Sequence, residues 1–191
     1  MKISSFLVVG LLALGLPSPL RAQVEGLRVE GGVVFLTHAG DFTFGTSEIE
    51  SDAGYAFRGR VRYGFGFVSV AAEFQESSQN YGNAAVPSAP QNLNTSFIGA
   101  TAALHPFKFA GIAPYAEIGV GKLFFGDQSI STDQGSIASV YGLGVGIGLS
   151  SKVGLDVNLR LVRLGNLTAQ GLGPSFDYDP KEFGLLLSIK L

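Results

Sequence analysis

Residues 53–74 read AGYAFRGRVRYGFGFVSVAAEF, and the character of the side chain changes at every second position. Apolar residues such as Tyr55 fall on one face, and Arg58, Arg60 and Arg62 fall on the other. Only a pleated strand places neighbouring side chains on opposite faces in this way. The alternation restarts after Gly66, so the stretch predicts two strands joined by a very tight glycine turn. One face of this hairpin is apolar, and the other carries three arginines and a glutamate.

The composition is that of one apolar, ordered domain. The 191 residues are 46% hydrophobic and have a mean hydropathy of +0.32. Only 15% are charged, against about 25% in a typical soluble domain. There are no cysteines, which excludes a disulfide framework and thiolate metal sites. The chain is too apolar to be disordered. Without disulfides its rigidity needs another source, and a closed sheet would supply one.

Residues 1–22 have the pattern of a cleaved secretory signal peptide. Lys2 supplies the basic start, residues 6–16 form an apolar run, and Ala22 ends a small-residue cleavage site. The apolar run is shorter than the roughly 20 residues that span a bilayer as a helix. The remaining domain, residues 23–191, has 11 basic and 15 acidic side chains and a formal charge of −4. That charge argues against a nucleic acid partner.

Period-two alternation recurs along the chain and predicts eight strands. Four long polar connections alternate with tight turns, as in a membrane barrel whose termini both lie on the periplasmic side. The strands have the roughly 9 to 11 residues that a tilted membrane strand needs. We therefore expect an all-β fold, an eight-stranded antiparallel up-and-down transmembrane β-barrel after a cleaved signal peptide. The expected strands are residues 27–37, 53–65, 68–75, 95–104, 114–125, 137–149, 153–164 and 181–191, with long loops at 38–52, 76–94, 126–136 and 165–180.

Residues 137–149 indicate which face is outside, because apolar residues there alternate with four glycines. Bare glycine on the outside of a soluble barrel would weaken the strand for no gain, whereas inside an eight-stranded barrel it leaves room for long side chains. The charges then face inward, where arginine–carboxylate pairs can satisfy them. The inverse reading is a soluble, lipocalin-like binder of an apolar ligand. The expected interior charge cluster comprises Arg58, Arg60, Arg62, Arg160, Glu30, Glu73, Glu117, Asp156 and Glu182.

Aromatic residues near the strand ends are typical of the two girdles that mark the membrane interfaces. The expected girdle residues are Tyr55, Phe57, Tyr63, Phe65, Phe67, Tyr115, Phe124, Phe125 and Phe183.

The eight strands and the closing segment FGLLLSIKL (residues 183–191) resemble small eight-stranded outer membrane barrels of the OmpA and OmpX type. The resemblance covers residues 24–191. The closing segment is similar to the family's C-terminal assembly signal, although Leu191 replaces the usual aromatic residue. The resemblance implies a location in the cell outer membrane, contact with its lipid and lipopolysaccharide, and recognition of the last strand by the barrel assembly machinery.

The sequence predicts a structural or surface-interaction role, with an unknown ligand or protein bound at the outer loops and a charge-plugged interior. The alternatives are a narrow passive pore for small solutes and a lipid A-modifying enzyme. Lipid-modifying barrels place a histidine near a serine and an acid at the outer rim. His38 lies near that rim without the spacing found in the deacylases, and His105 lies at the opposite end. We therefore expect no enzyme activity and no cofactor.

The expected outer loops are acidic, but no stretch has the alternating oxygen ligands of a calcium loop. No metal site is predicted from these residues, which are Asp41, Glu48, Glu50, Asp52, Asp127, Asp133, Asp177 and Asp179.

Overall fold

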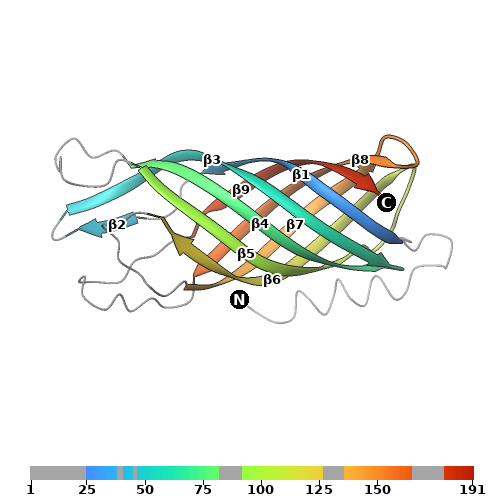
Figure 1. Ribbon diagram of the computed structural model, residues 1–191, viewed down its shortest axis with the longest axis horizontal. Helices are drawn as coiled ribbons and strands as arrows, with labels where there is room; N and C mark the ends of the chain where they lie inside the picture. Colours follow the sequence, from blue (N-terminus) through green and yellow to red (C-terminus); the bar gives the residue numbers. More distant parts are fainter. Residues whose placement is uncertain (1–24, 38–40, 45–46, 82–91, 127–135, 165–178) are drawn as a thin grey trace.

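The computed structural model describes residues 25–37, 41–44, 47–81, 92–126, 136–164 and 179–191. These residues form one antiparallel sheet that closes on itself (Figure 1). Among them, no helix is long and apolar enough to cross a membrane. The strands are β1 (Gly26–Thr37), β2 (Asp41–Phe44), β3 (Ser47–Phe65), β4 (Val68–Tyr81), β5 (Asn92–Leu104), β6 (Ile112–Phe125), β7 (Ser136–Gly148), β8 (Val153–Leu164) and β9 (Lys181–Lys190).

Eight strands make the barrel, and β1 closes it by pairing with both β3 and β9. Val33, for example, lies opposite Phe57 of β3 and Leu185 of β9. Each of the other pairs of adjacent strands in the barrel consists of two strands that follow each other in the sequence. The expected eight-stranded up-and-down topology is therefore confirmed.

The two ends of the barrel differ in their connections. The end that holds the start of β1 and the finish of β9, which we call the terminal end, has short connections of at most seven residues. Gly66 makes the β3–β4 turn with φ at +69°, a conformation that costs a glycine little. Ala110 and Gly111, with φ at +48° and +83°, turn the chain before β6 as in a type I′ hairpin. The opposite end, which we call the loop end, carries the long connections.

Two of the expected loops were drawn too long. Within residues 38–52 the chain forms β2 and the first part of β3, with Phe44 opposite Ser47. Within residues 76–94, β4 continues to Tyr81 and β5 begins at Asn92. Residues 76–80 are all polar, and β2 has only four residues, Asp41–Phe44, so composition and length indicated loops. A strand ladder is held by backbone hydrogen bonds, however, and Ser77 and Thr95 also bond to each other across it.

The apolar face of the barrel is outside and the charged face is inside. On β7, Ile137 and Leu143 are 69% and 65% exposed, whereas Arg60 on β3 is 2% exposed. This polarity matches the membrane barrel and excludes the inverse, lipocalin-like arrangement for the described strands.

The lumen also has an apolar layer, which the sequence analysis did not predict. Its members lie on the parts of the strands nearest the loop end, where the polar side chains of Ser77, Gln79 and Thr95 are also buried. At its base, the Phe97 ring covers Gly99 and Gly121, where any Cβ would overlap it. The layer comprises Val34, Leu36, Ala56, Phe97, Leu123, Ala138, Val140 and Val162.

The substitution Gly121→Val tests this packing. The new side chain would displace the Phe97 ring, so we expect a loss of about 1–3 kcal/mol in the free energy of unfolding. Urea unfolding of the protein in lipid vesicles measures this loss. Gly59→Val is the matched control, because a Cβ at Gly59 meets no atom within 4 Å. Equal destabilisation by both variants would contradict the packing argument.

Candidate functional site

Arg60 lies at the centre of the charged interior and contacts carboxylates from three other strands. Its Nε is 2.6 Å from Glu30 Oε2 of β1, its Nη2 is 3.0 Å from Asp156 Oδ1 of β8, and its Nη1 is 3.2 Å from Glu117 Oε2 of β6. These charge-assisted bonds cross the lumen and use the whole guanidinium fork. One side chain on β3 thus connects strands on several sides of the barrel.

Arg160 and Arg58 extend this network toward the loop end. Arg160 binds Glu73 with two bonds, of 2.5 Å from Nη2 to Oε1 and 3.1 Å from Nη1 to Oε2. Arg58 pairs with Glu182. It also donates to Gln75 Oε1 at 2.7 Å and to Asn158 Oδ1 at 3.0 Å. Polar amides therefore complete the coordination that the carboxylates leave open.

Arg62 is held more loosely than the other three arginines. Its closest carboxylate oxygens are Glu30 Oε1 at 3.5 Å and Glu117 Oε2 and Asp156 Oδ2 at 3.8 Å. Its guanidinium carbon lies 4.8 Å from the centre of the Tyr115 ring. Arg62 thus marks the edge of the network that faces the terminal end.

The structure places all nine of the sequence-derived charged residues inside the barrel, each at most 4% exposed, and joins them in one network. We call this set the interior cluster: Arg58, Arg60, Arg62, Arg160, Glu30, Glu73, Glu117, Asp156 and Glu182.

Tyr115 is not a girdle residue, and its assignment from the sequence is wrong. It is 3% exposed, and its hydroxyl donates to Asp156 Oδ1 at 2.8 Å. The ring covers Gly144, where any Cβ would overlap it. Glu117, two residues further along β6, also points inward, so the alternation of the strand places Tyr115 inside the barrel. Proximity to a strand end does not decide which face a side chain occupies.

Seven of the expected girdle residues have side chains on the outer surface: Tyr55, Phe57, Tyr63, Phe65, Phe67, Phe124 and Phe183. Phe35, which the sequence analysis left out, is 51% exposed, and its ring lies 6.4 Å from that of Phe183. The side chain of Phe125 falls outside the described ones.

The structure brings one histidine close to a serine, a pairing that the sequence did not reveal. His105 Nε2 lies 2.9 Å from Ser69 Oγ, so the β5–β6 turn is tied to the start of β4. Burial and the positive charge of Arg62 lower the pKa of His105 to about 4, which leaves the ring neutral at pH 7. Ser69 is only 1% exposed, and no described acid orients His105 Nδ1.

His38 and the acidic positions 127, 133 and 177 lie outside the described residues, and the same is true of the side chains at 41–52. Asp179 faces Arg163 across 3.8 Å at the loop end. In the described part of the chain, no group of three or more metal-binding side chains comes together.

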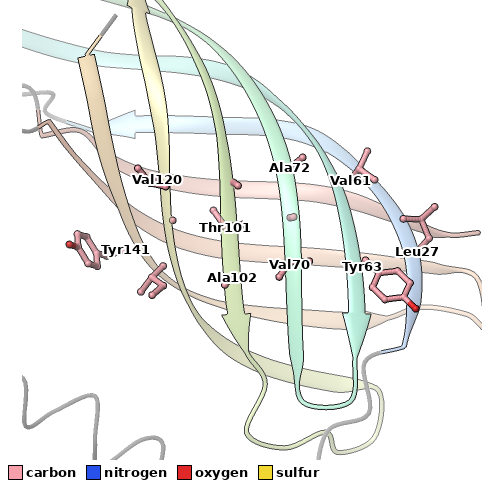
Figure 2. Close-up of a pocket in the computed structure, with 13 residues that line it drawn as sticks. Leu27, Val61, Tyr63, Val70, Ala72, Thr101, Ala102, Val120 and Tyr141 are labelled. Carbon is pink, nitrogen blue, oxygen red and sulfur yellow. The ribbon is translucent and has the colours of Figure 1, made fainter.

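The described part of the barrel includes two hollows of different chemistry. The first is a shallow apolar groove on the outer surface, where small residues such as Ala72 and Ala102 lie between larger ones such as Tyr63 and Tyr141 (Figure 2). The second is a polar cavity of about 300 Å³ at the terminal end, bounded by Arg28, Arg62, His105 and Asp156 among others.

Comparison with known proteins gives the family. The chain matches the outer membrane protein beta-barrel domain over residues 6–187. The chain belongs to this outer membrane family. No curated protein sequence matches it.

Solved structures share the fold of this outer membrane barrel at low sequence identity. Neisserial surface protein A (NspA) has a TM-score of 0.63 and 16% identity, covering 87% of this chain and 98% of its own. OprG from Pseudomonas aeruginosa has a TM-score of 0.62 and 13% identity, covering 90% and 99%. Ail, the attachment invasion locus protein of Yersinia pestis, has a TM-score of 0.52 and 13% identity, covering 88% and 100%.

The family fixes the setting of the barrel. The protein lies in the outer membrane, and its apolar outer surface contacts membrane lipid. In this family tight turns face the periplasm and longer loops face outward. The terminal end is therefore periplasmic, and the loop end is extracellular.

Replacing Arg60 with Ala should leave Glu30, Glu117 and Asp156 without their shared partner. Breaking a buried pair from one side typically costs about 3–5 kcal/mol, and we expect a loss of that size in vesicle unfolding experiments. Arg163→Ala is the matched control, because the Arg163–Asp179 pair is largely exposed and such pairs contribute about 1 kcal/mol or less. A loss in R60A no larger than in R163A would contradict a bracing role.

Tyr115→Phe tests the interior position of this ring. Loss of the hydroxyl removes its bond to Asp156, and we expect about 1–2 kcal/mol of destabilisation. Tyr63→Phe is the control, since Tyr63 is 52% exposed on the outer surface and should change stability by less than about 0.5 kcal/mol. Urea unfolding in lipid vesicles measures both variants. A larger loss of stability in Y63F than in Y115F would show that the Tyr115–Asp156 hydrogen bond does not stabilise the barrel.

Proposed function

We propose that this protein is a sealed outer membrane barrel with a structural or surface-interaction role carried by its extracellular loops. The observation that carries the proposal is the reach of Arg60 across the lumen to β1, β6 and β8. Ions or solutes could pass only by separating buried charge pairs, which is costly at low dielectric. A narrow passive pore is therefore disfavoured.

The apolar layer supports the same proposal from the extracellular side. Val34, Leu36 and Ala56 form a buried cluster with at most 1% exposure, and Phe97 and Leu123 are each 4% exposed. A passing ion would lose part of its hydration beside these apolar side chains, which cannot replace it. Two barriers of different chemistry thus lie in series along the lumen.

We also propose that the outward aromatic residues form two interfacial girdles. Tyr55 and Tyr63 lie eight residues apart on β3, which is about 27 Å along a strand. A strand tilt of about 40° reduces this to about 21 Å along the membrane normal, close to the roughly 25 Å apolar band of such barrels. Tyr55 and Phe57 would mark the extracellular interface, and Tyr63, Phe65 and Phe67 the periplasmic one.

Export and assembly complete the proposal. A cleaved signal peptide at residues 1–22 suits a protein that must reach the outer membrane. The alternating outward residues of β9, from Phe183 to Ile189, suit recognition of this closing strand by the barrel assembly machinery. Lipopolysaccharide is the proposed lipid partner near the extracellular girdle.

The proposed role is not enzymatic. The buried Ser69–His105 pair has the distance of a nucleophile and its base. Ser69 is inaccessible, however, and the pair lies at the periplasmic end, away from the outer leaflet. A tie between two periplasmic turns accounts for the contact.

Planar bilayer recording tests the seal. We expect the purified wild-type barrel to show no discrete conductance steps over the voltage range that the bilayer tolerates. The closed fold is checked in the same preparation by faster gel migration of the unboiled protein. Reproducible anion-selective openings of the folded protein would overturn the sealed-barrel proposal in favour of a narrow pore.

A further inference from the structure

The periplasmic mouth of the lumen forms a cup below the interior cluster, with a volume of about 300 Å³. It is bounded by turns and strand ends from opposite sides of the barrel. Five basic side chains line it, against two acidic ones. The basic residues are Arg28, Arg62, Lys108, Lys152 and Lys190, and the acidic ones are Glu30 and Asp156.

Both acids of the cup already pair with Arg60, which lies deeper in the lumen than the cup. Glu30 accepts from Arg60 Nε at 2.6 Å, and Asp156 accepts from Arg60 Nη2 at 3.0 Å. Asp156 also accepts from Tyr115 and from Asn158. Their negative charge is thus largely used within the interior cluster, and the cup keeps an excess of positive charge.

Three buried nitrogen atoms at the cup have no hydrogen-bond partner among the described residues: Arg28 Nε, Arg62 Nη2 and His105 Nδ1. Arg62 is 4% exposed and His105 is 3% exposed. The nearest carboxylate oxygen to Arg62 Nη2 is that of Glu117 at 3.8 Å, whereas a charge-assisted bond is about 2.7–2.9 Å long. Arg28 Nε and Arg62 Nη2 are obligatory donors, and buried donors without partners are rare in folded proteins and call for an explanation.

We propose that this cup binds the phosphoryl group of a small periplasmic molecule. A phosphoryl group carries up to two negative charges and several acceptor oxygens, which suits two arginine forks and three lysines better than a single carboxylate does. Ser188, 5% exposed, adds a hydroxyl to the wall. The lysines lie on the exposed rim, where they attract the anion, and Arg62 receives it at the base.

The glycine wall of the cup leaves this space open. A Cβ added at Gly146 would meet only the carbonyl oxygen of Ala113, at 3.7 Å. A Cβ at this position therefore fits without overlapping the backbone, and a longer side chain would extend into the cup. Gly146→Leu is a blocking variant that leaves every charge in place.

Isothermal titration of inorganic phosphate into the full-length processed barrel in zwitterionic micelles tests the proposal. We expect saturable binding that weakens at least ten-fold in K108Q/K152Q and in G146L. The matched control is K122Q/K181Q, which removes two exposed lysines remote from the cup and should bind as the wild type does. Gel mobility of unboiled samples verifies that each variant is folded.

A second titration, with phosphatidylglycerol added to the same micelles, distinguishes the source of the phosphoryl group. Cup-dependent binding of phosphate supports a soluble ligand, and cup-dependent binding of the lipid alone assigns the same site to a headgroup. No binding of either probe, or equal loss in K122Q/K181Q and K108Q/K152Q, would overturn the proposal.

Discussion

The neutralisation of buried charge is the constraint on which this barrel depends. A closed ladder satisfies the backbone in lipid, but eight strands enclose a lumen too narrow for bulk water. Each charged group that points inward must therefore find a partner across the lumen. Arg60 meets this requirement with three carboxylates, and Arg160 does so with the fork of Glu73. The middle of the lumen is therefore filled by side chains that form ion pairs.

The lumen changes chemistry along its axis. Near the extracellular end it is apolar around Phe97, in the middle it is a network of ion pairs, and at the periplasmic end it opens into a basic cup beside Arg62. Glycines allow these layers to coexist, because Gly144 and Gly121 make room for the rings of Tyr115 and Phe97. The proposed seal belongs to the first two layers, and the proposed anion site belongs to the third.

Alternation along each strand was enough to predict the barrel and the side of the sheet on which Arg58 or Glu117 lies, because the side-chain period of a strand is two. It could not show which acid meets which arginine, since that depends on register between strands far apart in sequence. The same limit hid the contact of His105 with Ser69. Tyr115 was misplaced because its nearness to a strand end was weighed above its phase in the alternation. β2 was missed because four residues, Asp41–Phe44, are too few for alternation to distinguish a strand from a loop.

The pairs across the lumen join residues that are distant along the chain. Arg60 and Asp156 lie 96 positions apart, and Arg58 and Glu182 lie 124 apart. A sheet that lacks β9 leaves Arg58 without Glu182, and a sheet that lacks β8 leaves Arg60 without Asp156, one of its three carboxylates. The ion-pair network is therefore complete only when the first and last strands meet, so closing the barrel also completes the charge balance of its lumen.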